Sequence, residues 1–396
     1  MKKLLALLLT LTMSVSLAAC GGGENQTEEP ASSAPAQSDS EDVSDDAAEG
    51  TVSAGEDLTW GLTPFEERQT LRLGFFTGSP LSYPFLFADN LGVFDALNID
   101  VEYTCFTGGP AMMEANAEWD MASCGLGGLA NGLYGYDFSL VDLTDYEENL
   151  AIFARADSEI AKDPDNPELW KGAACVYPAG TTAQAVLAKY LNNMGLTLAD
   201  VESINMDNAN ALTGFNGGTG DVLGCWNAIA LSAEDAGYVR ISDSGQLNIG
   251  MPCGTFATKD MMENHFDLVV TACIVFHKAA EWCYESDANM EQAATWYLDH
   301  CDEEGFLCDE SIAKRTMDWY RGPSVDEWIE LYTKTSPDDA GLYTSRELLQ
   351  AEKDILVGLD FFISEGKYTN EDRTRYLDDQ RIDPSVAQAA KELLGK

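Results

Sequence analysis

The sequence predicts an α/β protein with two sets of strand–helix units and a helical C-terminal part. Three observations lead to this class. Short, nearly continuous apolar runs such as Leu71–Phe76 are typical of parallel strands that are covered on both faces. Turns rich in Gly, Ser, Thr or Pro follow these runs and precede segments of helical periodicity. Beyond Thr258 the strand pattern stops and helical segments continue to the C-terminus.

The first set opens with strand–loop–helix units between Leu71 and Gly128. After Leu71–Phe76 a turn and helix run to Leu91, and after the strand Ile99–Cys105 a helix runs to Trp119 and leads into the strand Asp120–Cys124. Such turns leave free backbone N–H groups at helix starts, in the crevice at the carboxyl ends of the strands. The arrangement predicts a ligand site made of loops. A Gly-rich segment, Gly125–Gly135, then precedes the strands 138–143 and 149–155.

A second set follows a polar, proline-containing excursion at 157–167. Its strands are expected at Ala173–Tyr177, Val201–Met206, Asp221–Cys225 and Tyr238–Ile241, with helices at Ala183–Met194, Asn208–Phe215 and Ala228–Ala236. Thr255–Thr258 is the last expected strand. The C-terminal helices are expected at Phe266–Tyr284, Met290–Asp302, Ser311–Tyr320, Val325–Tyr332, Ser345–Ile363 and Pro384–Leu394.

The first 20 residues have the features of a bacterial lipoprotein signal. Lys2 and Lys3 precede an apolar core, and Leu17–Cys20 forms a small-residue cleavage site that ends in cysteine. We expect cleavage before Cys20 and lipid on its sulfur. The alternative is an ordinary secretory signal with an incidental cysteine.

Residues 21–59 contain eleven acids, no Lys or Arg and almost no large apolar side chain. This composition predicts a disordered, extended tether. The remaining 337 residues carry 56 acids against 21 bases, about −35, and exceed a typical single core. Such a charge argues against nucleic acid and against electrostatic docking to anionic lipid. Tethering through lipid is compatible with it.

The cysteines and histidines suggest neither a metal site nor catalysis. Nine cysteines remain besides Cys20, none in a CxxC arrangement, and His265, His277 and His300 lack metal-ligand spacing with them. Most cysteines lie in apolar runs, which favours buried thiols, although some pairing outside the cytoplasm stays possible. No Ser-His-Asp, HExxH or Walker motif is present, so we expect no catalytic residue, no metal and no cofactor.

Five segments, in order, resemble the solute-binding proteins of ABC importers, in the nitrate/sulfonate/taurine (SsuA-like) group that includes binders of thiamine precursors. They are LRLGF at 71–75, ADNLGVFDALNIDVEY at 88–103, FTGGPAMMEANAEWDMASCG at 106–125, KGAACVYPAGTTAQAVLAKYLNNMGLTLADVE at 171–202 and TGDVLGCWNAIA at 219–230. The resemblance covers roughly residues 70 to 260.

The resemblance implies the type II periplasmic-binding fold, in which two βα lobes are joined by two hinge crossings and close on a ligand. The crossings are expected near 151–156 and 253–259. Lobe I would then comprise 60–152 and 260–396, and lobe II 153–259.

The same resemblance places ligand contacts on the loops that follow the strands. Those of the first lobe are Gly78, Ser79, Pro80, Tyr83, Phe106, Thr107, Gly108, Cys124 and Gly125. Those of the second are Gly180, Thr181, Thr182, Asp207, Asn208, Asn210, Trp226 and Asn227.

Each contact has a structural alternative. Thr181 and Thr182 serve equally as helix caps, and Gly108 with Gly109 as a turn. Trp226 would fit a core, but it follows a strand and precedes an Asn, which favours stacking on a ligand. Phe76 suits core packing better than ligand contact.

The expected loops contain no basic residue, which departs from the anion-binding members of the group; Arg155, at a crossing, is the nearest. Where the family usually has glycine, Asn131 or Cys124 faces the crevice. A heterocyclic solute such as a vitamin precursor, held by Asn, Thr and aromatic rings, fits these loops better than a sulfonate-like one.

The resulting hypothesis is a monomeric, lipid-anchored binding protein outside the cytoplasm of a bacterium, which delivers its small-molecule ligand to an ABC permease and ATPase. One rival is a sensor that presents the ligand to a membrane receptor. Another is the yeast-type pyrimidine synthase of thiamine synthesis, but its cysteine-rich iron motif and reactive histidine have no counterpart here.

Overall fold

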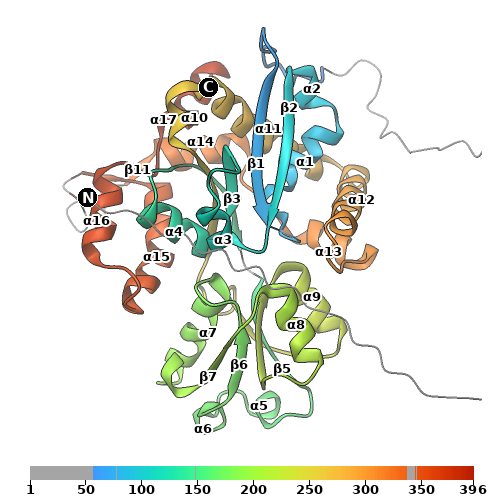
Figure 1. Ribbon diagram of the computed structural model, residues 1–396, viewed down its shortest axis with the longest axis vertical. Helices are drawn as coiled ribbons and strands as arrows, with labels where there is room; N and C mark the ends of the chain where they lie inside the picture. Colours follow the sequence, from blue (N-terminus) through green and yellow to red (C-terminus); the bar gives the residue numbers. More distant parts are fainter. Residues whose placement is uncertain (1–56, 77, 148, 337–343, 345) are drawn as a thin grey trace, which may run out of the picture. The chain divides into compact units, whose positions relative to one another are not determined.

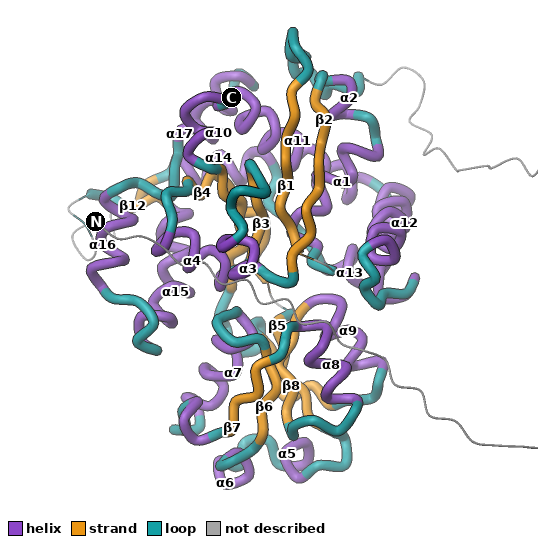
Figure 2. The backbone as a smooth tube through the Cα atoms, viewed as in Figure 1, coloured by secondary structure: helices purple, strands orange, loops and turns teal. Residues whose placement is uncertain are grey.

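The computed structural model describes residues 57–76, 78–147, 149–336, 344 and 346–396 (Figure 1). The expected signal segment, Cys20 and nearly all of the expected tether lie outside these residues. Within them the chain forms two separate five-stranded sheets, each flanked by helices (Figure 2).

The first sheet has the strand order β2-β1-β3-β10-β4. Its strands are β1 (Gln69–Phe76), β2 (Ile99–Phe106), β3 (Met121–Cys124), β4 (Ser139–Glu147) and β10 (Met251–Ala257). β1 runs parallel to both β2 and β3, with Leu73 beside Tyr103 on one edge and beside Met121 on the other. β10 lies antiparallel between β3 and β4.

The second sheet has the order β7-β6-β8-β5-β9. Its strands are β5 (Leu150–Ala154), β6 (Ala174–Tyr177), β7 (Glu202–Asn205), β8 (Val222–Trp226) and β9 (Val239–Asp243). β6 is parallel to β7 and β8, whereas β5 lies antiparallel between β8 and β9. The α/β class with two sheets is confirmed, and each sheet is mixed because one strand runs against the others.

The antiparallel strands mark where the chain changes sheet. It leaves the first sheet after Glu147 and enters the second at Leu150, and it returns between Asp243 and Met251. Both passages lie a few residues earlier than the expected crossings near 151–156 and 253–259. The reason is that the apolar runs 150–154 and 251–257 are themselves buried strands, so each passage comes before the run that was expected to contain it.

Helices cover the sheets. Beside the first sheet are η1 (Pro80–Ser82), α1 (Tyr83–Asn90), α2 (Val93–Ala96), α3 (Gly109–Glu114) and α4 (Leu126–Gly135). Beside the second are α5 (Glu159–Lys162), α6 (Pro167–Trp170), α7 (Thr182–Asn193), η2 (Leu198–Asp200), α8 (Asn208–Asn216) and α9 (Asn227–Asp235).

The C-terminal part is helical as expected and returns to the first sheet. It consists of α10 (Lys259–Asn264), α11 (Phe266–Glu285), α12 (Asp287–Glu303), α13 (Glu310–Trp319), α14 (Val325–Thr333), the short strands β11 (Thr335–Ser336) and β12 (Leu348–Leu349), α15 (Gln350–Ser364), α16 (Asn370–Asp378) and α17 (Ser385–Leu393). α11 packs on α1, α15 on α4 and β10, and α17 on β4.

One helix lies in a segment to which the sequence assigns no element. The Gly-rich segment after Gly125 is the helix α4, and most of it is buried. Glycine disfavours helix by about 1 kcal/mol per residue, but here it permits close packing. A Cβ at Gly132 would lie 2.3 Å from the Phe256 ring, and one at Gly128 only 3.0 Å from the Cα of Gly109. Tertiary contact therefore overrides local propensity.

Two buried hydrogen bonds fasten the C-terminal helices to the sheet. His277 on α11 is fully buried, with Nε2 2.9 Å from Asp142 Oδ1 on β4 and Nδ1 2.7 Å from the Pro323 carbonyl oxygen. The ring thus connects α11 to β4 and to the segment before α14. The ring also stacks on Trp328 of α14.

Seven cysteines are buried thiols, in agreement with the interpretation favoured by their apolar surroundings: Cys124, Cys175, Cys225, Cys253, Cys273, Cys283 and Cys301. Among the helices that the structure describes, none has the length and apolar character needed to cross a membrane.

Candidate functional site

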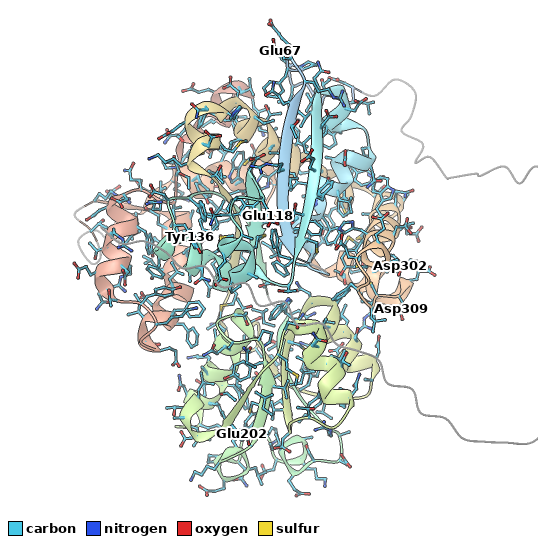
Figure 3. All side chains as sticks on the ribbon, in the orientation of Figure 1. Glu67, Glu118, Tyr136, Glu202, Asp302 and Asp309 are labelled. Carbon is cyan, nitrogen blue, oxygen red and sulfur yellow. The ribbon has the colours of Figure 1, made fainter. Side chains whose placement is uncertain are left out.

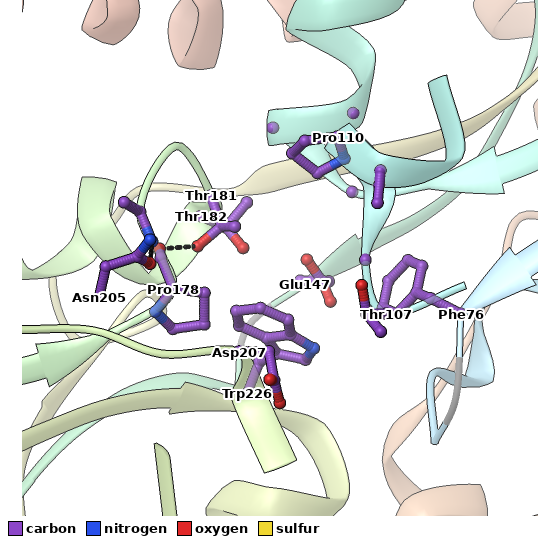
Figure 4. Close-up of a pocket in the computed structure, with 17 residues that line it drawn as sticks. Phe76, Thr107, Pro110, Glu147, Pro178, Thr181, Thr182, Asn205, Asp207 and Trp226 are labelled. Carbon is purple, nitrogen blue, oxygen red and sulfur yellow. Dashed lines mark hydrogen bonds between the residues drawn. The ribbon is translucent and has the colours of Figure 1, made fainter. Parts of the chain in front are cut away.

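A cleft of about 230 Å³ is lined by loops that belong to both sheets (Figure 4). From the first sheet come Phe76, Thr107, Gly108, Gly109, Pro110, Ala111, Gly125, Gly127, Gly128 and Glu147. From the second come Pro178, Ala179, Thr181, Thr182, Asn205, Asp207 and Trp226. Most of these residues follow the carboxyl end of a strand and precede a helix, the position where α/β sheets hold ligands.

Glycines shape the wall on the side of the first sheet. α3 begins at Gly109 and α4 begins after Gly125, and the two helix starts touch where Gly109 meets Gly128. No residue with a Cβ would fit at that contact. The free N–H groups of two helix starts are therefore held next to each other at the cleft.

The loop 178–182 forms much of the opposite wall. Thr181 occupies the N-cap of α7, but its hydroxyl donates to the Pro178 carbonyl at 2.7 Å instead of accepting from the helix. Asp207 caps α8: its carboxylate accepts from the backbone N–H of Asn210 at 3.0 Å and from the Asn210 side chain at 2.6 Å. Both residues line the cleft while fixing the backbone beside it.

Trp226 ends β8 and is held by its backbone. The Asn208 side chain accepts from the Trp226 N–H and donates to the Trp226 carbonyl, both at 3.3 Å. The next residue, Asn227, has φ +49°, a left-handed conformation that Asn tolerates better than most residues. This sharp turn between strand and helix places Trp226 in the lining of the cleft, which Glu147 also lines (Figure 4).

The two walls touch at one point. A Cβ placed on Gly127 of α4 would lie 2.4 Å from the Gly180 carbonyl oxygen and 3.0 Å from the Thr181 Cα. Because these are backbone atoms, only glycine permits this approach between the elements of the two sheets.

One hydroxyl links the two crossings between the sheets. Ser244, fully buried, donates from Oγ to the Glu147 carbonyl at 3.1 Å and accepts from the Leu150 N–H at 3.4 Å. Its own N–H donates to the Leu150 carbonyl at 2.9 Å. The passage after β4 and the passage before β10 are thereby tied together next to the cleft.

Glu147 lies at this tie, on the floor of the cleft, and is only 4% exposed. Its Oε1 accepts from the Asn227 side chain at 3.3 Å, and its Oε2 faces Gly125. Burial raises the pKa of Glu147 to about 7, although hydrogen bonds from the Cys253 thiol and the Asn227 amide partly oppose the rise.

The structure gathers some of the expected ligand contacts at the cleft and places others elsewhere. Those that line it are Thr107, Gly108, Gly125, Thr181, Thr182, Asp207 and Trp226. Asn208 and Asn227 stand behind Trp226, and Gly180 lies where the walls touch. Asn210 bonds Asp207, and Cys124 lies beneath Gly128.

The remaining expected contacts are not among the lining residues. Tyr83 is buried against Tyr297 and Cys301, and Ser79 with Pro80 begins η1. Gly78 faces the ring of Phe306, and Phe106 ends β2. Asn131, expected in the crevice, accepts from the Tyr368 hydroxyl at 2.6 Å.

Glu147 is the main cleft residue that sequence reasoning missed. The contacts expected from the sequence lie on loops that follow parallel strands. Glu147 instead ends the strand that leads into a crossing between the sheets. An available signal was the acidic run Glu147–Glu148 between two apolar strands. Phe76, assigned to the core, also lines the cleft. Asn205 and the small residues of the lining were likewise absent from the expectation.

The described chain contains no group of three or more His, Cys, Asp or Glu side chains arranged to hold a metal. All three histidines are away from the cleft lining: His277 in the core, His300 against Phe75 and Tyr83, and His265 exposed at the end of α10. The side chains of the cleft offer hydrogen bonds, one aromatic face from each wall and two carboxylates.

No protein-family model matches the sequence, and no curated protein is detectably related to it in sequence. Solved structures do match. The periplasmic aliphatic sulphonate binding protein SsuA from Escherichia coli is 17% identical, with a TM-score of 0.58 over 77% of this chain and 91% of that one. The periplasmic nitrate-binding protein NrtA from Synechocystis is 12% identical, with a TM-score of 0.62 over 84% of this chain and 90% of that one.

A third match is a ligand binding component of an ABC-type import system from Staphylococcus aureus, 12% identical, with a TM-score of 0.61 over 82% of this chain and 99% of that one. The chain therefore has the type II periplasmic-binding fold, and the resemblance to the sulfonate and nitrate group is confirmed at the level of the fold. At these identities the likeness extends to the architecture and not to the ligand.

The raised pKa of Glu147 makes a prediction about stability. Folding raises this pKa from the ordinary 4.5 to about 7, so the protonated form is favoured in the folded state. The contribution of the protonated Glu147 side chain to the free energy of unfolding is fully present below about pH 4.5. It is lost as the pH rises through about 7, which lowers the free energy of unfolding by about 3 kcal/mol. Glu147→Gln, neutral at every pH, should gain stability over the parent by up to that amount between pH 5 and pH 8.

Urea unfolding of both proteins across this range measures the difference. Glu202→Gln, the same change at an exposed position on β7 (Figure 3), serves as the control and should show a constant difference. A constant difference for Glu147→Gln as well would contradict the assigned environment.

Proposed function

We propose that this protein captures a small organic solute in the cleft between its two lobes, outside the cytoplasm, and delivers it unchanged to an ABC importer. The observation that carries the proposal is the cleft itself, which is built from strand-end loops of both sheets. A ligand that contacts both walls favours the closed arrangement, because those contacts exist together only when the lobes meet.

The two crossings suit this motion. Among the described residues, the chain passes between the two sheets after Glu147 and again between Asp243 and Met251, and Ser244 ties the two passages together. A rotation about such a tie changes few backbone angles, while each sheet keeps its own core.

The solved structures support the same class of function. Their names describe binding of sulfonate, of nitrate and of an unspecified ligand of an importer. We extend the general role of solute capture to this chain. The solute proposed here is a small organic molecule, with a heterocyclic compound preferred over a sulfonate-like one.

Binding without chemical change is proposed because the solved structures that match this fold are described as binding proteins or as a ligand binding component of an importer. The location is proposed from the N-terminal sequence: lipid on Cys20 would hold the protein at the outer face of the membrane, and the acidic segment after it would serve as a tether.

Trp226→Ala should weaken solute binding about tenfold or more, because loss of ring contact removes roughly 1 kcal/mol or more. Trp226→Phe retains a ring and should lose less. Thermal-shift screening of metabolites first identifies a stabilising solute, and titration calorimetry then compares the three proteins, whose unfolding should stay cooperative. Equal affinities would remove Trp226 from the binding site.

Gly127→Ala tests closure. The added methyl group would meet backbone of the opposite wall, so closure should become incomplete and solute affinity should fall by about tenfold. Gly135→Ala, on the same helix but with open space around the new Cβ, is the matched control. Small-angle scattering with saturating solute should show a more open Gly127→Ala than Gly135→Ala. Identical scattering and affinity would contradict closure at this point.

Cys20→Ala should release the protein from the membrane fraction, because the proposed lipid has no other attachment site. Cys308→Ala, which changes a partly exposed thiol in the folded part, should remain membrane-bound. Immunoblots of membrane and soluble fractions provide the measurement. Continued fractionation of Cys20→Ala with membranes would refute the anchor.

A further inference from the structure

The charges at the cleft differ from those expected of an anion-binding site. Among the described residues that line it, Glu147 and Asp207 are the charged ones, and both are acids. The Asp207 carboxylate is committed to Asn210, on both oxygens. Glu147 is the buried one of the two acids, so a charge-assisted hydrogen bond to it would be shielded from water.

Nearby positive groups are directed elsewhere. The Arg240 guanidinium bonds Asn149, Glu234 and Asp243. The Lys367 amino group lies near Gly180, over the rings of Phe362 and Tyr368, and is not part of the lining. The interactions described for Glu147 involve the Asn227 amide and the Cys253 thiol, and neither carries a positive charge.

Two helix starts lie next to this acid. α4 begins beside Gly125, which faces Glu147 Oε2, and α9 begins at Asn227, whose side-chain amide donates to Oε1. Helix N-termini favour negative charge. Above about pH 7 the Glu147 carboxylate itself supplies negative charge at this place, so an anionic ligand would meet a like charge there.

The indole of Trp226 and this carboxylate line the same cleft (Figure 4). A flat group that stacks on this ring can direct N–H donors toward Glu147. Such charge-assisted hydrogen bonds are stronger than neutral ones, and a cation also gains from the aromatic face.

We propose that the cleft selects a small planar organic cation, of the amidinium or protonated amino-heterocycle type, with its N–H groups on Glu147 and its face on Trp226. This inference rests on the proposed function and narrows it, because it names the chemical class of the solute.

Three probes with the same ring separate the charge classes: benzamidinium, benzamide and benzenesulfonate. Titration calorimetry at pH 8 with the purified protein should rank benzamidinium first and benzenesulfonate last. Glu147→Gln should weaken benzamidinium about tenfold or more and leave benzamide nearly unchanged. Glu202→Gln, an exposed acid on β7, should change none of the three.

Tightest binding of benzenesulfonate to the parent protein, or an unchanged benzamidinium affinity in Glu147→Gln, would overturn the inference. Failure of all three probes would also overturn it. The proposed function fails separately: thermal-shift screening of a broad metabolite panel that finds no stabilising solute of any charge would count against solute capture itself.

Discussion

The chain passes twice between the two sheets, and the buried hydroxyl of Ser244 joins the two passages. The rest of the site depends on this constraint. The carbonyl oxygen of Glu147 accepts one of these hydrogen bonds. The tie therefore also positions the residue whose carboxylate lines the cleft. The connection between the sheets and the buried acid of the cleft therefore belong to one structural feature.

Glycine and asparagine provide the geometry around that feature. Gly109, Gly127 and Gly128 allow helix starts and loops to approach at distances that no Cβ would permit. Asn208 and Asn227 secure the turn that presents Trp226. None of these residues contributes a large contact area, and their effect is to place N–H groups, one indole ring and one buried acid within a small volume.

Much of this architecture is predictable from the sequence because the strands are short apolar runs with clear turns after them. The expected strand Ile99–Cys105 and helix 266–284 lie within a residue of β2 and α11. Local sequence patterns do not reveal the direction in which strands pair. The antiparallel placement of β5 and β10 is therefore not predicted, and the chain crosses between the sheets a few residues earlier than expected. The helix α4 was missed because its glycines disfavour helix locally, and only contacts with Phe256 and Gly109 explain them.

Some cleft residues are likewise predictable from the sequence, and others depend on tertiary structure. Trp226 and Thr181 follow parallel strands, where the rule for open sheets directs attention, and both line the cleft. Tyr83 and Gly78 satisfy the same sequence rule but pack against the C-terminal helices, which no local pattern foretells. Glu147 can be recognised as a cleft residue only when the place where the chain leaves the first sheet is known. Sequence reasoning thus located the loops, while the chemistry of the cleft emerged from tertiary structure.

Solute capture in the cleft can be measured by native mass spectrometry of the protein isolated from its own cells without denaturation. We expect one equivalent of a small, planar, nitrogen-containing solute, which is released intact on unfolding and is present at lower occupancy in Gly127→Ala. An anionic solute in that position would contradict the assigned charge of the cleft. A molecule recovered in chemically altered form would contradict binding without reaction.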